Sequence, residues 1–317
     1  MATVIFHHPF DSESDAVALK DAISSLGERD DALIQILGNR TNEQRKRIME
    51  TYKIMFDQDL RDTLLYKLTG NFKRTVELLL MPLAEYYAKL LRRAIYGPGK
   101  DEDLLLEILC TITNIQIQQI KEIYQCKFGK SLEDSIANDC QSKFKHMLLL
   151  ICKAERNEGV VSLDKVRNDA EALFEAGEAE WETDEAAFNT LFAFESYEHL
   201  RFVFQEYEDI TGRTLSEAIE AETTGYMKKA LLTIVRCVEN TPAYFARKLY
   251  RALKGPTKDD KSLIRIVVSR CEIDMVFIKT EYQKRFKEHL EDTIRGNEPE
   301  NYEKLLMALV TLDKQKK

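Results

Sequence analysis

Residues 96–103 read YGPGKDED, and this short stretch decides how the chain is organised. It separates two apolar runs with helical spacing, LLRRAI before it and LLLEIL after it. Proline cannot donate a helical hydrogen bond and glycine tolerates turn conformations, so one helix should end here. The acidic residues that follow suit the positive N-terminal end of the next helix. The stretch therefore predicts a sharp turn between two helices.

Composition agrees with a large helical protein. The chain has 317 residues, 44% of them hydrophobic and 32% charged, with only 12 Gly and 6 Pro. We therefore expect an all-α globular fold. No stretch approaches the roughly 20 uncharged apolar residues of a membrane span, and the first residues show no secretory signal. The net charge of −8 argues against nucleic acid as the main partner and against simple electrostatic attraction to an anionic bilayer.

The cysteines point to an intracellular protein with reduced thiols. They show no CxxC spacing and no Cys/His pattern typical of metal sites. Four of them lie between positions 110 and 152, so a single disulfide in this part of the chain stays an open alternative. The six are Cys110, Cys126, Cys140, Cys152, Cys237 and Cys271.

A fourfold repeat becomes visible when the chain is counted from Gly99. Its counterparts are Gly27, Glu182 and Thr257, at separations of 72, 83 and 75 positions. An acidic residue follows each of them three positions later and a leucine 33 positions later. A tyrosine follows each 25 positions later, at Tyr52, Tyr124, Tyr207 and Tyr282. Four tyrosines at one offset are unexpected by chance, and we predict that they lie in the core.

The repeats define the predicted domains. We expect an amino-terminal arm over residues 1–13, followed by repeats over 14–85, 86–158, 159–243 and 244–317, the third including a connector. That connector, RNEGVVSLDKVRND at 156–169, is polar and occupies the longest gap. We therefore predict a seam between two halves of the molecule there.

Repeat two shows the internal plan. Apolar residues recur at helical spacing around 90–95, 104–109, 117–124, 132–136 and 144–151, which predicts five helices, A to E. Thr113, Ser131 and Ser142 stand where N-caps are useful. If A, B, D and E form a bundle and C crosses it, the A–B and D–E turns lie at the same end.

A distant acid completes a candidate metal site. Forty residues after the four loop positions stand Lys67, Asp139, Glu222 and Asn297. Repeat two thus combines an open glycine turn, whose carbonyls can converge, with a carboxylate from the D–E turn. Calcium takes about six to eight oxygen ligands from carboxylates, carbonyls and water. The sequence therefore predicts a calcium site in repeat two.

These features together resemble the annexin family over nearly the whole chain. The loop, the helix pattern, the tyrosine and the distant acid recur four times in the family's order, and GEAEWETDE and YRALKGPTKDD are similar to family loops. The resemblance implies four repeats of five helices arranged as a slightly curved disc. It also implies a non-enzymatic cytoplasmic protein that binds acidic phospholipid membranes, peripherally, when Ca²⁺ rises.

The resemblance also implies particular ligands. In repeat two they are the carbonyls of Ile95, Gly97 and Gly99 and the carboxylate of Asp139, with Lys100 and Glu102 as a weaker accessory site. In repeat three they are the carbonyls of Gly177, Glu180 and Glu182 and the carboxylate of Glu222. Trp181, at the tip of that loop, would then contact the membrane, where tryptophan is favoured.

The other two repeats depart from the pattern. Repeat one has Ser25 in place of a glycine and Lys67 in place of the acid, and this cation should repel calcium. Repeat four keeps Gly255 but has Thr257 and Asn297, and an amide is a poor substitute for a bidentate carboxylate. With one intact site and one doubtful one, we expect a higher calcium requirement than in a four-site relative, or self-association on the membrane.

Structural alternatives stand beside these functional interpretations. A glycine turn can be only a helix end, Asp101 and Glu102 can simply favour a helix start, and Trp181 can be a buried core residue. A helical scaffold for protein partners, with decayed calcium sites, is the main rival function. We find no nucleotide-binding loop, no HExxH motif and no EF-hand loop in the sequence.

Overall fold

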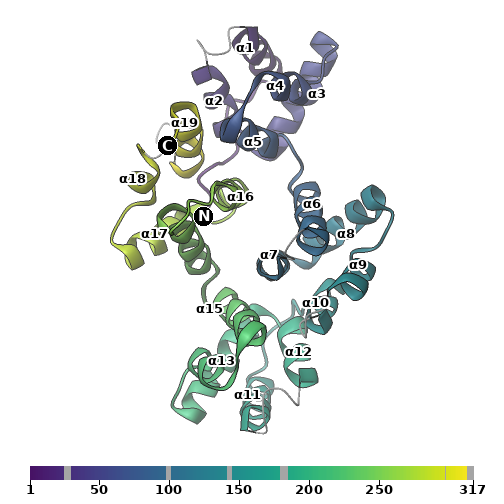
Figure 1. Ribbon diagram of the computed structural model, residues 1–317, viewed down its shortest axis with the longest axis vertical. Helices are drawn as coiled ribbons and strands as arrows, with labels where there is room; N and C mark the ends of the chain where they lie inside the picture. Colours follow the sequence, from purple (N-terminus) through teal and green to yellow (C-terminus); the bar gives the residue numbers. More distant parts are fainter. Residues whose placement is uncertain (25–29, 98–100, 141–144, 179–184, 297, 313–317) are drawn as a thin grey trace. The chain divides into compact units, whose positions relative to one another are not determined.

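The structure is a computed structural model that describes residues 1–24, 30–97, 101–140, 145–178, 185–296 and 298–312. Within these ranges all regular structure is α-helical, in 19 helices (Figure 1), so the predicted fold class is confirmed. The first group is α1 (Ser12–Ser24), α2 (Asp30–Asn39), α3 (Asn42–Phe56), α4 (Leu60–Lys67) and α5 (Gly70–Leu79). The second is α6 (Leu83–Tyr96), α7 (Glu102–Leu109), α8 (Asn114–Phe128), α9 (Leu132–Asp139) and α10 (Lys145–Cys152).

The five-helix plan continues through the second half of the chain. The third group is α11 (Leu163–Glu178), α12 (Glu185–Phe194), α13 (Tyr197–Thr211), α14 (Leu215–Glu222) and the first part of α15 (Gly225–Lys254). The fourth is the rest of α15 with α16 (Asp260–Arg270), α17 (Met275–Phe286), α18 (Leu290–Ile294) and α19 (Glu300–Val310). α15 breaks at Asn240, whose φ of −159° and ψ of 89° are not helical. Pro242 follows, so α15 supplies one helix to each group.

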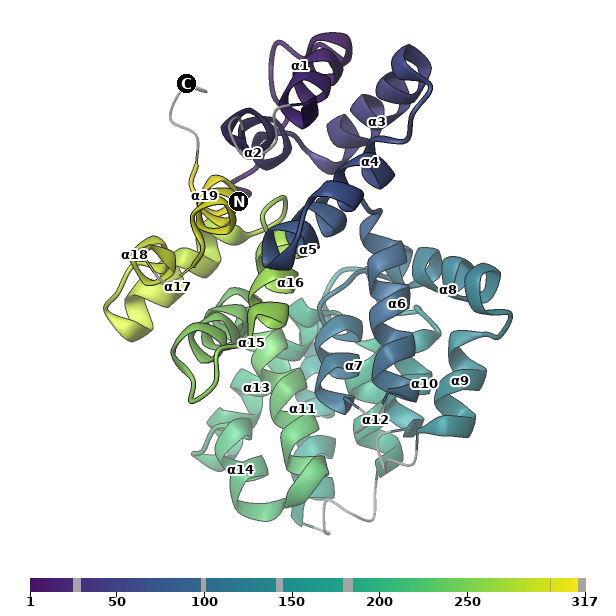
Figure 2. The same cartoon turned by 45° about the horizontal axis from the view of Figure 1, so that its top comes forward.

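In the second repeat the third helix, α8, is the crossing helix (Figure 2). Figure 2 shows α6, α7 and α9 running in roughly one direction, with α8 lying across them. Capping fixes where α8 begins and ends. The Thr113 hydroxyl accepts from the Gln116 amide in a capping box, and Gly129 ends the helix with a left-handed φ of 69°. Ser131 caps α9 by accepting from the Asp134 amide. The predicted caps at Thr113 and Ser131 are therefore confirmed, and Ser142 lies outside the described residues.

The recurring tyrosines are core residues, as predicted. All four have at most 1% of their surface exposed: Tyr52, Tyr124, Tyr207 and Tyr282. Tyr52 and Tyr124 each contact a phenylalanine four residues later, edge to face, at centroid distances of 4.8 and 4.9 Å. Equivalent positions in different repeats therefore make equivalent core contacts, which is the physical reason that the tyrosine spacing revealed the repeat.

The chain forms two compact units, and the predicted seam is wrong. One unit combines Met1–Leu83 with Pro242–Lys317, and the other is Ala84–Thr241. The connector at 156–169 therefore lies inside one unit. The reason is that Arg156 ties neighbouring repeats together: its backbone amide donates to the Asn114 side chain at 3.1 Å, and its guanidinium donates to the Phe192 carbonyl at 3.0 Å. The polar groups of this connector therefore form hydrogen bonds to the repeats before and after it.

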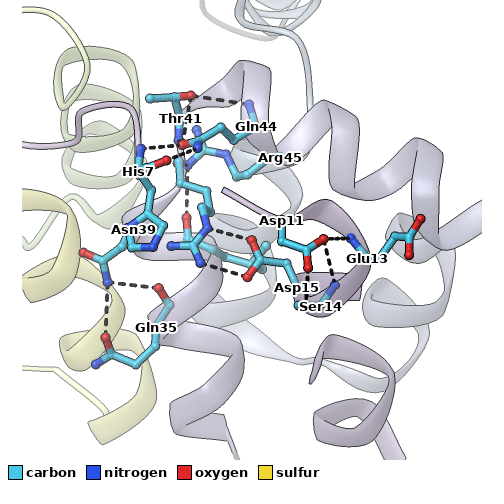
Figure 3. A network of polar contacts seen from close by, with 12 residues as sticks. His7, Asp11, Glu13, Ser14, Asp15, Gln35, Asn39, Thr41, Gln44 and Arg45 are labelled. Carbon is cyan, nitrogen blue, oxygen red and sulfur yellow. Dashed lines mark hydrogen bonds and ion pairs between the residues drawn. The ribbon is translucent and has the colours of Figure 1, made fainter. Parts of the chain in front are cut away.

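The amino-terminal arm is held by both repeats of its unit. The Thr3 hydroxyl donates to the Leu309 carbonyl at 2.6 Å, and the Thr3 amide donates to the Cys271 carbonyl at 2.8 Å. Further along, the His7 amide and carbonyl exchange hydrogen bonds with the Gln44 side chain, both at 3.0 Å (Figure 3). Beyond Gln44, the guanidinium of Arg45 pairs with Glu272 at 2.7 Å, joining α3 to the last repeat. The arm is thus part of the folded unit.

The described helices and the cysteines bear on two predictions made from the sequence, the lack of a membrane span and the reduced thiols. Among the helices that the structure describes, none is both long enough and apolar enough to cross a bilayer. All six cysteines are thiols, five of them buried and Cys126 exposed. The alternative of a disulfide between positions 110 and 152 is therefore wrong. Burial raises the pKa of the Cys110 thiol to about 12, so this group stays protonated at neutral pH.

Candidate functional site

The turn after α6 begins with a backbone pattern that closes the helix end. The Gly97 amide donates to the Arg93 carbonyl at 2.7 Å, and the Asp101 amide donates to the Ala94 carbonyl at 3.0 Å. Ile95, the second-to-last residue of α6, belongs to the last turn, whose carbonyls have no partner within the helix. Gly99 and Lys100 lie outside the described residues, so their ligand roles stay predictions.

Glycine is required at Gly97 for a steric reason. A Cβ built there would clash with the carbonyl oxygen of Arg93, which is backbone and cannot move aside cheaply. Gly255 in the fourth repeat is in the same position, since a Cβ there would clash with the Arg251 carbonyl oxygen. The hydrogen bonds match as well, because Gly255 donates to Arg251 at 3.0 Å. The second and fourth repeats therefore open their A–B turns in the same way.

The acids that follow this turn have different roles. The Asp101 carboxylate accepts from the Leu104 amide at 3.1 Å and so caps α7. This contact supports the structural interpretation of Asp101. Glu102 is the first residue of α7 and is half-buried. Its accessory ligand role stays a prediction.

Asp139 lies beside the end of α6, where its carboxylate is hydrogen-bonded to Tyr96. Asp139 is the last residue of α9 and Tyr96 the last of α6. A hydrogen bond with Ser135 acts to lower the pKa of the Tyr96 phenol, but desolvation and the hydrogen-bonded Asp139 carboxylate raise it, and the net direction is upward. The predicted acid and the end of α6, after which the predicted turn begins, therefore lie side by side. Sequence reasoning missed Tyr96, although it directly precedes the glycine turn.

In the third repeat the acid has a charged partner. Glu222 is the last residue of α14 and pairs with the guanidinium of Arg213, a partly exposed contact. Gly177 is the second-to-last residue of α11, the position that Ile95 has in α6. Glu180, Trp181 and Glu182 lie outside the described residues, so the shape of this loop and the membrane contact of Trp181 stay predictions.

In the first repeat a lysine bonds to the equivalent of the Ile95 carbonyl. Lys67 is the last residue of α4, as Asp139 is of α9. Its ammonium donates to the carbonyl oxygen of Ile23 at 2.8 Å. Ile23 is the second-to-last residue of α1, again the position of Ile95 in its helix. The cation predicted in repeat one is therefore bonded to the carbonyl that corresponds to Ile95, which is a predicted ligand in repeat two. Ser25 lies outside the described residues.

The fourth repeat contains an ion pair that sequence reasoning missed. Asn297 lies outside the described residues, but the next residue, Glu298, pairs with Lys258 at 2.6 Å. Only 1% of the Glu298 side chain is exposed, and this burial raises the pKa of its carboxyl group although the Lys258 ammonium opposes the shift. The sequence feature that could have revealed this pair is a lysine in the A–B loop, Lys258, together with an acid, Glu298, one position after the expected one.

The donor set of the second repeat has the chemistry that calcium prefers. Among the described residues, no group of three or more His, Cys, Asp or Glu side chains could hold a metal ion. A site built mainly from carbonyls needs just one such side chain, so Asp139 and the opened end of α6 still fit calcium. Glycine at position 97, where a Cβ would clash, is the structural observation that supports this fit.

Comparison with known proteins identifies the family. The annexin family profile matches four segments, residues 14–79, 86–151, 168–234 and 244–309. The chain is 42% identical to annexin A13 from Mus musculus over 305 residues, which cover 96% of each chain. The solved structure of annexin III superposes with a TM-score of 0.92 at 36% identity, covering 98% of both chains. Chicken annexin V superposes with a TM-score of 0.87 at 38% identity, again covering 98% of both chains.

These matches extend over all four repeats and agree with the five-helix plan, the buried tyrosines and the glycine turns. The chain belongs to the annexin family, whose members bind calcium and, through it, acidic phospholipid membranes.

Proposed function

We propose that this annexin binds acidic phospholipid membranes when calcium rises, chiefly through its second repeat. The observation that carries the proposal is the contact between Asp139 and Tyr96, in which the D–E carboxylate lies beside the end of α6. The proposed ligands are the carbonyls of Ile95, Gly97 and Gly99 and the carboxylate of Asp139. Lys100 and Glu102 form the proposed accessory site.

The chain's own charge explains why a cation is needed. At −8, the protein and an anionic membrane repel each other. Calcium, when bound, supplies positive charge and coordination positions that phosphate or carboxylate oxygens of lipid can fill. The residues of the turn present carbonyl oxygens, and Asp139 supplies the single negative charge of the set. Because this ligand set carries little charge, the dissociation constant for calcium in the absence of lipid should be about 10⁻⁴ to 10⁻³ M.

Linkage then couples the two ligands. Lipid must raise calcium affinity by the same factor by which calcium raises lipid affinity. A family member with several sites gains avidity, whereas this chain offers one well-supported site. We therefore propose a comparatively high calcium requirement, or self-association on the membrane that restores avidity.

The third repeat is proposed as a weaker second site, with the carbonyls of Gly177, Glu180 and Glu182 and the carboxylate of Glu222. Its ion pair with Arg213 favours this ranking, because Glu222 must exchange a charged partner to bind calcium. Trp181, on the same loop, is proposed to enter the lipid interface.

A helical scaffold with decayed calcium sites is the second candidate function. Two contacts favour it: the Lys67 ammonium bonds to the Ile23 carbonyl, and Lys258 pairs with Glu298. Each places a positively charged side chain of the protein itself where the repeat would otherwise bind calcium. Under either function we propose a non-enzymatic cytoplasmic protein without a nucleic-acid partner. The first function adds peripheral membrane attachment when calcium rises.

The test compares two substitutions on the same helix. Co-sedimentation with vesicles of phosphatidylserine and phosphatidylcholine is measured against calcium for wild type, Asp139→Asn and Asp134→Asn. Asp134 is exposed in the first turn of α9, so its variant controls for charge. We expect Asp139→Asn to raise the calcium midpoint about tenfold or more and Asp134→Asn to leave it unchanged. If co-sedimentation of the wild-type protein does not change with calcium, the scaffold function is favoured.

A further inference from the structure

The contact between Lys67 and Ile23 occupies the position at which the second repeat is proposed to bind calcium. Lys67 ends helix D of its repeat just as Asp139 does, forty residues after the loop position. The Lys67 Nζ lies 2.8 Å from the Ile23 carbonyl oxygen. That oxygen is the repeat-one equivalent of the Ile95 carbonyl. A positive charge from the chain itself is therefore bonded to a backbone oxygen of the expected ligand set.

We infer that Lys67 is a built-in substitute for a calcium ion in the first repeat. An ammonium group is a compact cation with three donors, so it can satisfy a last-turn carbonyl of α1 that the helix leaves without a partner. It also carries its own charge, which removes the need for an acid at this position. The first repeat thus connects the ends of α1 and α4 without calcium. This inference rests on the proposed calcium site of the second repeat.

The surroundings of Lys67 leave its side chain open to solvent. The residue is exposed, so its charge keeps access to water and is not costly to hold. Lys67 also lines an open cavity of about 730 Å³ within its own unit, together with the start of α5 and the start of α19. Water and small ions can therefore reach this side of the residue, and calcium could enter if the ammonium were removed.

An ordinary helix-end contact is the competing explanation. Lysines satisfy other helix ends in this chain: Lys121 donates to the Cys152 carbonyl at 3.0 Å and Lys279 to the Val310 carbonyl at 2.9 Å. Both of those lysines lie on the third helix of their group, whereas Lys67 stands at the acid position of its repeat. The two explanations differ in what an acid at position 67 would do, since only a substituted ion site should gain calcium.

The experiment therefore exchanges the lysine for the acid of the second repeat. Calcium bound per protein is measured by equilibrium dialysis on phosphatidylserine vesicles for wild type, Lys67→Asp, Asp139→Asn and the double variant. Because Ser25 replaces a glycine, Lys67→Asp is also made together with Ser25→Gly. Lys46→Asp, on an exposed residue of α3 in the same repeat, is the matched charge control.

We expect Lys67→Asp, in at least one of the two backgrounds, to bind one more calcium ion than wild type, and the double variant to keep an ion that Asp139→Asn loses. Lys46→Asp should bind as wild type does. If neither Lys67→Asp protein gains an ion while wild type still binds calcium, the inference is overturned and the proposed function stands. If wild type binds none on vesicles, the proposed function fails, and a gain in Lys67→Asp alone would still support the inference.

A second readout needs no membrane. Hydrogen exchange of the last-turn amides of α1 is measured with and without calcium. We expect wild type to be protected equally in both conditions, and Lys67→Asp to lose protection without calcium and regain it with calcium. Lys67→Met should lose it in both. Exchange in Lys67→Met that matches wild type would show that the ammonium does not hold this helix end, and would contradict the inference.

Discussion

In the second repeat the last residue of helix D is Asp139, whereas in the first repeat it is Lys67. The helices around these two residues share their order, their buried tyrosine and a contact to the end of helix A. The contacts have opposite electrostatic character: Asp139 meets a phenol, and Lys67 meets a carbonyl. The same position therefore carries an anion in one repeat and a cation in the other, while the helices that present it keep their order.

The largest expected effect tests whether the two repeats share their core. Tyr52→Ala and Tyr124→Ala each remove a fully buried ring, and each should lower the free energy of unfolding by about 3–5 kcal/mol. Urea unfolding followed by circular dichroism, analysed for two units, provides the measurement. A loss below about 1 kcal/mol in one variant alone would show that the two cores are not equivalent.

The second prediction separates the turn's geometry from its chemistry. Gly97→Ala and Gly255→Ala create the same clash with a backbone carbonyl, so both should cost about 1–3 kcal/mol of stability. Only Gly97→Ala should also raise the calcium midpoint of vesicle binding, on the order of tenfold, because the fourth repeat lacks the acid at its equivalent position. Equal calcium midpoints in the two variants would place binding outside the second repeat.

The third prediction concerns the ion pair in the third repeat. Arg213→Gln releases Glu222 from its charged partner, so the calcium midpoint should fall by up to about fivefold, the value of a partly exposed ion pair. Calcium-dependent vesicle binding is measured in the Asp139→Asn background, so that the proposed second-repeat site does not contribute to the measured binding. The gain should shrink as sodium chloride rises, because salt screens the pair. A salt-independent gain would point to another cause.

The smallest expected effect is at Tyr96. Tyr96→Phe keeps the ring but removes the hydroxyl that donates to the Asp139 carboxylate. The phenol then no longer competes with calcium for that carboxylate. Calcium affinity should rise by about twofold to threefold, as the phenol is partly exposed. Calorimetric titration on vesicles can resolve this change. A weaker affinity would instead show that Tyr96 positions Asp139 for binding.

The sequence predicted the fold through residues that repeat for packing reasons. Tyr124, Thr113 and Ser131 had a recognisable spacing because each repeat needs the same buried ring and the same helix starts. The seam at 156–169 was wrong, because a polar segment does not reveal whether its polar groups face water or, as at Arg156, hydrogen-bond to two neighbouring repeats.

The candidate site was predictable in part, for a related reason. Spacing indicated that Asp139 would reach the A–B turn, and the contact with Tyr96 brings it to the end of α6. It also indicated a cation at Lys67, but only the structure shows that the ammonium bonds to the Ile23 carbonyl. The pairing of Lys258 with Glu298 was missed because it lies one position away from the repeat pattern.

The division into units has a consequence for how the protein is made. The unit formed by Ala84–Thr241 is continuous, so all of it is synthesised before the last repeat begins. Its companion needs both ends of the chain, including α19, which packs on α2. At about 5–20 residues per second, the first repeat waits on the order of 10–50 s on the ribosome for its partner. During that interval the faces of α2 and α5 that pack on α16 and α19 in the finished protein are uncovered.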